Sequence, residues 1–328
     1  MKQIAAGIGL ILFAAGALAA DVPAQQFGDL GDFRLDSGEV IRGCRIGYRQ
    51  AGPLAADQSN VIVVTTWFGG SSSGLLGMTG DGNFFDTSRY HVIVIDALGD
   101  GVSSSPSNGT AQPRERFPRF TMRDMVRSQH ELLTRVLHID KVYAVAGLSM
   151  GGMQVFQWIA SYPEFMQKAV AIAGSPKLTS QDIILWRTQL DLLDSTHGSR
   201  DAMNAVAGIN ELELHTPSWI AKNVTDPGKT LEEHRKAMDR LDPFDYMSQL
   251  RAMIAHDISA DFHPPLKPKM LIVVALQDHM VNPGPAREFA RANGVALVTL
   301  SGDCGHLATA CEREVLMREV AGFLKDEG

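Results

Sequence analysis

The sequence predicts an α/β fold in which a mainly parallel sheet is covered by helices on both faces. Short apolar runs rich in β-branched residues alternate with longer segments of helical period, as parallel strands and their crossover helices require. A serine flanked by glycines, in residues 147–151, directly follows one of these runs and opens a helical segment. With 328 residues, 45% of them hydrophobic, the chain is long and apolar enough to bury such a core.

The predicted sheet starts with an antiparallel segment and continues with six apolar strands. We expect residues 22–50 to form antiparallel strands. Turn signals occur within this segment at Gly31 and Ser37-Gly38, and just after it at Gly52-Pro53. The apolar runs expected as these strands are residues 61–66, 91–96, 142–148, 168–173, 270–276 and 295–300.

Two amphipathic segments predict helices that cover this sheet. Thr121 is placed to cap the first helix, with Asp124 at its third position. The apolar stripe of this helix consists of Met122, Met125, Val126, Leu132, Leu133, Val136 and Leu137. The last segment of the chain repeats the helical period with Leu316, Val320, Phe323 and Leu324.

Between residues 177 and 265 the alternation stops, and the composition becomes helical, charged and rich in methionine. An insertion of this size between two core strands predicts a helical cap over the carboxyl ends of the strands, where ligands bind in open α/β sheets. The predicted core then comprises residues 20–176 and 266–328, and the predicted cap residues 177–265. The alternative is a separate helical domain without a part in catalysis.

The first nineteen residues differ from the rest of the chain. Lys2 is followed by an apolar run over residues 4–18 and by Ala17-Leu18-Ala19, a pattern typical of a cleavable secretory signal peptide over residues 1–19. The alternative is a membrane anchor, which needs about 20 apolar residues, whereas this run is shorter and interrupted by glycines. We therefore expect an exported protein, periplasmic or secreted, with no membrane span in the mature chain.

Charge and cysteine content exclude several other classes of protein. A net charge of −7 provides no basic field for a phosphate backbone, so we expect no nucleic-acid partner. Cys44, Cys304 and Cys311 lack the close Cys/His spacing of a zinc site, and we expect neither a metal nor a cofactor. In an oxidising compartment we expect a disulfide between Cys304 and Cys311, with Cys44 unpaired. The alternative is that Cys304 and Cys311 remain buried thiols.

The segment Gly147-Leu148-Ser149-Met150-Gly151 carries the strongest functional signal. It lies at the strand–turn–helix junction that a G-x-S-x-G nucleophile elbow requires, and its glycines leave room for a strained turn beside strand and helix. Ser149 is therefore the predicted nucleophile, and the alternative is a plain loop at a helix start. A phosphate-binding loop would need a Gly-Lys-Ser/Thr ending, which this segment lacks.

A serine hydroxyl becomes an effective nucleophile only with a base in hydrogen-bond reach and an acid that orients this base. In the predicted arrangement the acid and then the histidine follow the nucleophile, at the ends of later strands. Asp278 follows the run that ends at residue 276, and His306 follows the run that ends at residue 300. We predict Asp278 as the acid and His306 as the base. His279 and Asp303 compete for these roles, although Asp303 is also suited to cap a turn.

Two backbone N–H groups are candidates for stabilising an oxyanion. Met150 stands at the helix start, where we expect its backbone N–H to face a developing oxyanion. The second donor is expected from the loop after residues 61–66, where Trp67 and Phe68 are the candidates and Trp67 is our choice. The side chains of Trp67 and Phe68 could equally line the pocket or belong to the core.

Longer segments around these motifs resemble the homoserine O-acetyltransferase family of the α/β-hydrolases. They are residues 147–154 followed by Trp158, residues 117–126, and Asp86-Thr87. The resemblance covers about residues 40–176 and the C-terminal segment, but little of the predicted cap. It implies an α/β-hydrolase fold, the triad assigned above and an acyl-enzyme formed on Ser149.

Three observations favour water over homoserine as the acyl acceptor. The family has an aspartate directly after the catalytic histidine to hold the amino-acid substrate, whereas this chain has Leu307. The family's cap arginine has no clear match within residues 177–265, and acetyl-CoA is a cytosolic donor. We therefore expect an esterase-like hydrolase of a small-molecule acyl substrate, with a homodimer as one option for its assembly. The alternatives are an O-acyltransferase that uses an alcohol such as homoserine, and a non-catalytic binding protein on the same fold.

Overall fold

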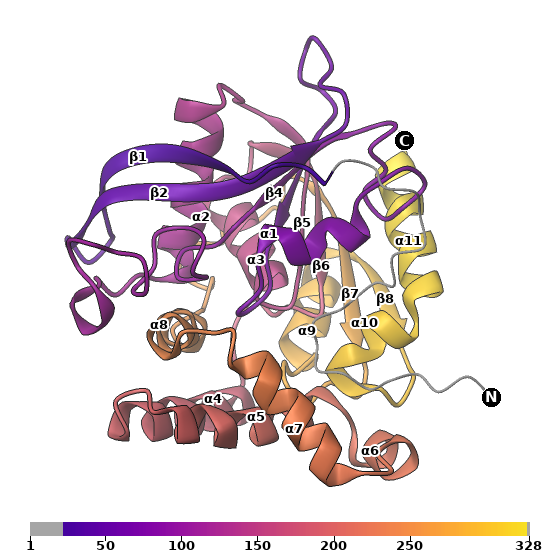
Figure 1. The fold of residues 1–328 in the computed structure, drawn as a ribbon. Helices are drawn as coiled ribbons and strands as arrows, with labels where there is room; N and C mark the ends of the chain where they lie inside the picture. Colours follow the sequence, from indigo (N-terminus) through magenta and orange to yellow (C-terminus); the bar gives the residue numbers. More distant parts are fainter. Residues whose placement is uncertain (1–21, 327–328) are drawn as a thin grey trace.

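The computed structural model describes residues 22–326, which form one eight-stranded sheet with helices on both of its faces (Figure 1). The predicted signal peptide at residues 1–19 lies outside the described residues. The strand order is β1-β2-β4-β3-β5-β6-β7-β8. The strands are β1 Gln26–Arg34, β2 Val40–Ala51, β3 Val61–Thr65, β4 His91–Ile95, β5 Val142–Leu148, β6 Met166–Ile172, β7 Lys269–Ala275 and β8 Ala296–Leu300.

Six of these strands, β3 to β8, form the parallel part of the sheet, and each apolar run predicted as a strand is one of them. β8 lies at the edge of the sheet and is mostly exposed. The ends of the six strands differ from the predicted ones by at most two residues. β1 and β2 join the sheet antiparallel, as predicted, because β2 pairs with β4 in the opposite direction. Strands β3 and β4 are buried along their whole length, since helices cover both faces of the sheet.

One predicted turn is wrong: Gly31 lies inside β1. The register between β1 and β2 shifts on both sides of Gly31, whose φ of 67° places it in the left-handed region. This geometry is a β-bulge, in which glycine supplies the backbone conformation that other residues adopt only with strain. The turn that connects β1 and β2 lies at Ser37-Gly38, as predicted.

The helices outside the segment between β6 and β7 divide between the two faces of the sheet. α2, α3 and α9 contribute to the core on one face, and α1 and α11 to the core on the other. Their bounds are α1 Ser72–Leu75, α2 Met122–Glu131, α3 Met150–Ser161, α9 Gly284–Asn293, α10 Ala308–Cys311 and α11 Arg313–Lys325. The predicted capping box is present: Thr121 Oγ1 accepts from the Asp124 amide, and Asp124 accepts from the Thr121 amide.

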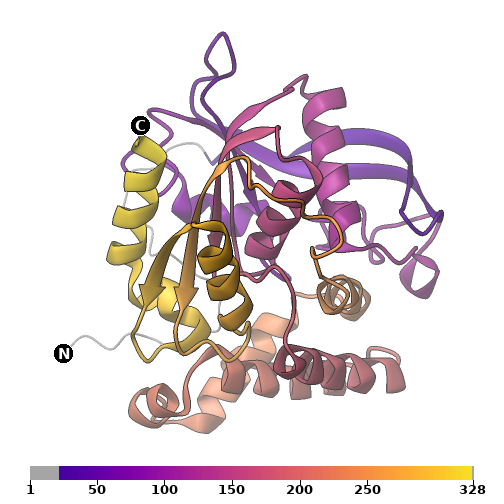
Figure 2. The same cartoon turned by 180° about the vertical axis from the view of Figure 1, so that it is seen from behind.

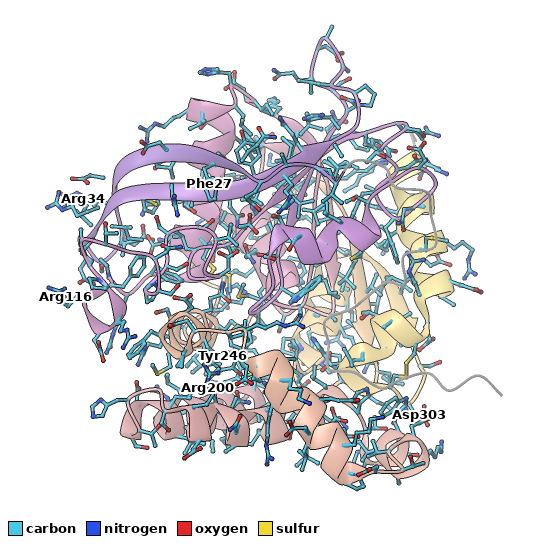
Figure 3. The ribbon with its side chains drawn as sticks, viewed as in Figure 1. Phe27, Arg34, Arg116, Arg200, Tyr246 and Asp303 are labelled. Atoms are coloured by element: carbon cyan, nitrogen blue, oxygen red, sulfur yellow. A yellow bond between two sulfur atoms is a disulfide. The ribbon has the colours of Figure 1, made fainter. Side chains whose placement is uncertain are left out.

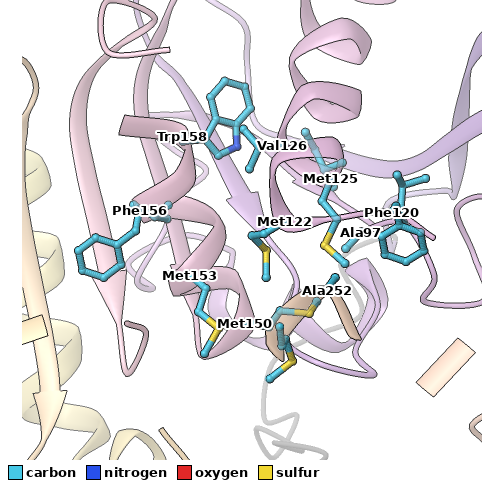
Figure 4. Packing of buried hydrophobic residues seen from close by; sticks show 14 of the residues in the cluster. Ala97, Phe120, Met122, Met125, Val126, Met150, Met153, Phe156, Trp158 and Ala252 are labelled. Carbon is cyan, nitrogen blue, oxygen red and sulfur yellow. The ribbon is translucent and has the colours of Figure 1, made fainter. Parts of the chain in front are cut away.

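The core between α2 and α3 consists mainly of methionine and aromatic side chains (Figure 4). Met122 and Met125 of α2 pack in the same cluster as Met150 and Met153 at the start of α3. Trp158, near the end of α3, is fully buried. This close packing holds α3, which carries the glycine–serine motif at its first turn, against the sheet.

Five helices lie between β6 and β7, within the segment predicted as a cap. They are α4 Ser180–Ser195, α5 Arg200–Leu214, α6 Pro217–Asn223, α7 Pro227–Met238 and α8 Pro243–Ile254. The arrowheads of β7 and β8 point toward this layer of helices, so it lies beyond the carboxyl ends of the parallel strands (Figure 2). Among the described residues, no helix has the length and apolar character that crossing a membrane requires.

Candidate active site

Ser149 stands alone between β5, which ends at Leu148, and α3, which begins at Met150. Its backbone has φ 59° and ψ −120°, a strained conformation for a residue with a side chain. The Ser149 amide donates a hydrogen bond to the carbonyl of Ile172 (2.8 Å), which ties the turn to the neighbouring strand. The strain and the tie together present the serine side chain at the carboxyl edge of the sheet.

The two glycines of the motif allow this turn because strand and helix approach each other closely there. A Cβ on Gly147 would overlap the Gly151 carbonyl and the Thr65 side chain. A Cβ on Gly151 would overlap the carbonyl of Thr65 at the end of β3. The Thr65 hydroxyl also donates to the Gly151 carbonyl (2.9 Å), so β3 and the start of α3 are joined directly.

The side chains of Ser149, His306 and Asp278 form one hydrogen-bonded chain. Nε2 of His306 lies 2.9 Å from Oγ of Ser149, and Nδ1 of His306 lies 2.6 Å from Oδ2 of Asp278. All three side chains are buried, with 9%, 6% and 5% of the residue exposed for Ser149, His306 and Asp278. The structure therefore brings together the three residues that the sequence predicts as nucleophile, base and acid.

The hydrogen bonds of Asp278 determine the tautomer of His306. An ionised carboxylate only accepts hydrogen bonds, so Nδ1 of His306 carries the hydrogen and Nε2 presents its lone pair to the Ser149 hydroxyl. The other carboxylate oxygen of Asp278 accepts from the amides of Met280 (2.9 Å) and Val281 (2.8 Å). Both oxygens are thus engaged, and these hydrogen bonds fix the orientation of the carboxylate toward His306.

The loop that carries His306 is held from two sides. On one side, Gly305 has φ 65° and approaches the end of α5 so closely that a Cβ would lie 2.8 Å from the carbonyl of Leu214. On the other side, a disulfide joins Cys304 to Cys311, as predicted, with Cα atoms 6.5 Å apart. Cys311 ends α10, so the disulfide joins the His306 loop to this short helix, which precedes α11.

The competing residues lie outside this chain of hydrogen bonds. Asp303 forms an exposed ion pair with Lys222 of α6 (2.6 Å), and this contact lowers the pKa of the Asp303 carboxyl. The Asp303 side chain therefore links its loop to the helical layer through Lys222, instead of capping the turn in that loop. Figure 3 labels Asp303 beside this layer. The His279 carbonyl accepts from Gln181 of α4 (3.3 Å), whereas its neighbour Asp278 faces His306. Cys44 is unpaired and buried, as predicted.

The two predicted oxyanion donors lie at the junctions of β3 and β5 with the segments that follow. Met150 is the first residue of α3, so its N–H has no acceptor within the helix. Trp67 follows the end of β3, and its indole ring lies against Gly70 and Gly74, where added Cβ atoms would contact it. The partly buried Trp67 ring packs against the core cluster on the α11 face of the sheet, while its backbone N–H remains the candidate donor.

Sequence reasoning assigned no role to two glutamines that hold this region. Gln154 Nε2 donates to the carbonyl of Thr66 (2.9 Å), directly before Trp67. Gln249 of α8 accepts from the Gly69 amide (2.9 Å) and donates to the Leu98 carbonyl (3.1 Å). Both side chains are fully buried. The sequence signal that could have identified them is a glutamine on an otherwise apolar helix face. Such a glutamine is buried, and a buried amide needs hydrogen-bond partners.

A cavity of about 200 Å³ lies between the loop at Gly69 and α8, separate from the three triad residues. Its wall includes Asp100 and Asp245, and burial raises the pKa of Asp245 to about 6. Burial, followed by the nearby charge of Asp96, also raises the pKa of Asp100. Within residues 22–326 no group of three or more His, Cys, Asp or Glu side chains is arranged to hold a metal ion.

Comparison with known proteins gives relatives of two kinds. An ethyl acetate hydrolase from Pseudomonas veronii is 32% identical over 197 residues, which are 58% of this chain and 56% of that protein. A homoserine O-acetyltransferase from Methanosarcina acetivorans is 37% identical over 171 residues, 47% of this chain and 31% of that protein. The chain thus spans about half the length, or less, of these relatives. Esterases and homoserine O-acetyltransferases are both related to it, as the sequence resemblance predicts.

The fold has close counterparts among solved structures. The structure of an acetylester hydrolase from Corynebacterium glutamicum superposes with a TM-score of 0.84 at 23% identity, covering 92% of this chain and 95% of that one. The family model described as alpha/beta hydrolase fold matches residues 61–309, which include every residue of the Ser149–His306–Asp278 chain. The protein therefore belongs to the α/β-hydrolase fold family, as the fold class predicted from its sequence requires.

Proposed function

We propose that the protein is an exported serine esterase that hydrolyses small esters through an acyl-enzyme on Ser149. The observation that carries this proposal is the buried chain from Ser149 Oγ through His306 to Asp278. Such a chain activates a hydroxyl for attack on an acyl carbon. Relatives of the protein include an ethyl acetate hydrolase and a protein named as a probable esterase.

The proposed reaction has two halves. In the first, Ser149 Oγ attacks the ester carbonyl carbon while its proton passes to Nε2 of His306. Negative charge then develops on the carbonyl oxygen, where the N–H groups of Met150 and Trp67 stabilise it. The bond to the leaving oxygen breaks, and His306 returns the proton to the departing alcohol. In the second half, water gives a proton to His306 and attacks the acyl carbon. The bond from that carbon to Ser149 Oγ then breaks, His306 returns the proton to Oγ, and the acid leaves.

Two observations support a small acyl substrate. Only 9% of Ser149 and 6% of His306 are exposed, so the reacting atoms are reached through a restricted approach. The curated relative from Pseudomonas veronii is named for ethyl acetate, an ester with a two-carbon acyl group. We therefore propose short-chain esters, acetyl esters first among them, as the substrate class.

Export is supported by the N-terminal pattern and by the disulfide. Residues 1–19 have the charge, apolar length and small-residue site of a signal peptide. A disulfide such as Cys304–Cys311 persists mainly in oxidising compartments. Expression of the full chain in a Gram-negative host tests this proposal: mass spectrometry of a periplasmic product should find a mature N-terminus at residue 20. A product that keeps residues 1–19 in the cytosol would contradict it.

A second candidate function is acyl transfer to an alcohol. The homoserine O-acetyltransferase from Methanosarcina acetivorans shares 37% identity over 171 residues, a specific observation in favour of transfer. Leu307, directly after the base, is the observation against an amino-acid acceptor, because the family has a carboxylate there. Water as the acceptor needs no such group.

One experiment separates these candidates. The purified mature protein is incubated with a panel of p-nitrophenyl and ethyl esters of two to ten acyl carbons, and separately with acetyl-CoA with and without homoserine. We expect ester hydrolysis that is fastest for the shortest acyl chains, and no acetylhomoserine. In Ser149→Ala, turnover and labelling by a fluorophosphonate should both be lost. Acetylhomoserine formed faster than acetate would favour the transferase, and labelling that persists in Ser149→Ala would overturn the nucleophile assignment.

A further inference from the structure

A line of buried polar side chains runs from the far end of α3 to the peptide before Trp67. Nε1 of Trp158 donates to Oε1 of Gln129 (2.9 Å), and Nε2 of Gln129 donates to Oε1 of Gln154 (2.6 Å). Nε2 of Gln154 then donates to the carbonyl of Thr66 (2.9 Å). Each of the four residues is 0% exposed. Figure 4 shows Trp158 and Met150 on the same helix, at opposite ends of the packed cluster.

The first group of this line determines the direction of the others. An indole N–H only donates, so it requires the oxygen of the Gln129 amide on its side. The Gln129 NH₂ group then faces Gln154 and requires the oxygen of that amide. As a result, the Gln154 NH₂ group is the part that faces Thr66. A flipped Gln154 amide would place two NH₂ groups against each other at Gln129 and two oxygens against each other at Thr66.

Gln154 contacts both backbone segments that carry the candidate oxyanion donors. Besides the Thr66 carbonyl, its NH₂ group lies 3.3 Å from the carbonyl of Met150, the first residue of α3. One buried amide therefore joins the loop after β3 to the first turn of the helix after Ser149. The distance between the Trp67 and Met150 amides depends on this junction.

A hydrogen bond to the Thr66 carbonyl also sets the direction of the Trp67 N–H. The peptide unit is planar and trans, so the Thr66 oxygen and the Trp67 hydrogen point to opposite sides of it. Turning the Trp67 N–H around would break the bond to Gln154 and leave buried polar groups without hydrogen-bond partners, which is unfavourable in a buried site. The orientation with the oxygen toward Gln154 is thus strongly preferred.

We propose that Gln154 is a positioning residue that holds the Thr66–Trp67 peptide so that the Trp67 N–H faces the oxyanion formed on attack by Ser149. Gln129 and Trp158 support it by fixing the direction of its amide. This inference rests on the proposed serine-esterase function. It adds a reason why the oxyanion site is formed before the substrate binds, which is the condition for electrostatic stabilisation without reorganisation.

The test compares two glutamines of the same helix. Gln154→Met keeps the length of the side chain and removes its hydrogen bonds, and Gln154→Glu keeps an oxygen toward Gln129 but loses the donor toward Thr66. Gln157→Met is the matched control, because Gln157 is also buried in α3 but bonds to Ser161 (2.8 Å) and Asp261 (3.0 Å). For each variant, the rate of fluorophosphonate labelling at Ser149, kcat and KM for the best ester, and the affinity for a trifluoromethyl ketone are measured.

We expect labelling and kcat to fall about 10- to 100-fold in both Gln154 variants, since loss of a whole oxyanion donor costs about 10²- to 10³-fold. KM should change less than about threefold, because the ground-state carbonyl needs this donor less than the oxyanion does. Affinity for the trifluoromethyl ketone, which forms an oxyanion adduct, should fall in parallel with kcat/KM. Gln157→Met should keep all of these values within about threefold of wild type.

Unchanged labelling in Gln154→Met, or an equal loss in Gln157→Met, would overturn the positioning role. If the Gln154 variants do not fold, Gln129→Met and Trp158→Phe serve instead, and each should give a smaller loss of the same kind; wild-type labelling rates in both would overturn the inference. Labelling needs no knowledge of the substrate, so it tests Gln154 even if no ester of the panel is hydrolysed. Wild-type protein that is not labelled at Ser149 would instead contradict the proposed function.

Discussion

Oδ2 of Asp278 lies 2.6 Å from Nδ1 of His306, although 28 residues separate the two in the chain. Asp278 follows β7 and His306 follows β8, and these neighbouring parallel strands end at the same edge of the sheet. Strand pairing therefore brings the two side chains together. The contact distinguishes Asp278 from Asp303, which is closer to His306 in sequence but faces Lys222.

Replacing the two aspartates should have very different effects on activity. Asp278→Asn keeps the size of the side chain but favours the wrong tautomer of His306, so kcat/KM should fall by about 10²- to 10⁴-fold. Asp303→Asn removes an exposed ion pair with Lys222 and should change kcat/KM by less than about threefold. Steady-state kinetics with one ester measures both. A larger loss in Asp303→Asn would transfer the role of acid to that residue.

Removing the disulfide should affect both stability and catalysis. The double variant Cys304→Ala/Cys311→Ala should lose about 2–3 kcal/mol of unfolding free energy by the chain-entropy model for so short a loop. Because the bridge spans the loop of the base His306, kcat should fall more than KM rises. Urea unfolding and ester kinetics, each with and without a reducing agent, are the measurements.

The reducing agent provides the control for this prediction. Reduced wild-type protein should behave like the double variant, whereas the double variant should not respond to reduction. Cys44 is buried and unpaired, so the reducing agent has no disulfide to break at this residue. Wild-type protein whose stability is the same in both conditions would show that the bridge does not support the loop.

Two glycine-to-alanine changes should have opposite effects on stability. In Gly151→Ala the new Cβ would overlap the Thr65 carbonyl at the end of β3, so strand or helix must shift and the position of Ser149 with it. We expect a loss of about 1–3 kcal/mol and a fall in kcat of at least about tenfold. In Gly322→Ala, within α11, the Cβ meets no atom, and alanine should stabilise the helix by about 0.5–1 kcal/mol.

Thermal unfolding and kinetics of the two glycine variants check this prediction. The changes are matched in chemistry, so the difference between them reports the surroundings of each glycine. Equal stability of Gly151→Ala and wild type would mean that the contact between β3 and the start of α3 can relax without loss.

Stability should depend on pH through His256. Its Nε2 lies 3.0 Å from the Ser175 carbonyl, and burial lowers the pKa of the ring to about 4. An unfolded histidine has a pKa of about 6.5, so between these values the unfolded chain binds a proton that the folded chain does not. Unfolding free energy should therefore fall as the pH decreases from about 6.5 to 4, by about 3 kcal/mol from this group.

The variant His256→Gln isolates this contribution. Glutamine does not titrate and still offers an amide donor to the Ser175 carbonyl. The slope of unfolding free energy against pH over that range should therefore decrease by the amount that corresponds to about one bound proton. Urea unfolding at intervals between pH 4 and 7 measures the slope. The same slope in wild type and variant would assign the acid sensitivity to other groups.

Several parts of the fold and site were predictable because they depend on short-range patterns. A buried strand is a run of apolar β-branched residues, a helix start carries a capping box at Thr121 and Asp124, and a nucleophile elbow has glycines two residues from Ser149. Even the order of Asp278 and His306 follows from the order of parallel strands. Each of these features requires only residues close together in the chain and a known topology.

The support of the site could not be predicted in the same way. Gln154 and Thr66 are 88 residues apart, and Gln249 and Gly69 are 180 residues apart. The approach of Leu214 to Gly305 likewise joins the helical layer to the loop of the base. Whether a given buried amide bonds to one carbonyl or another depends on how helices pack at distances of a few ångströms. The periodicity of the local sequence does not predict this packing. Short-range pattern thus determined which residues could react and which two cysteines could pair beside the base. Tertiary packing decided which buried amides and close backbone approaches hold the reacting residues in place.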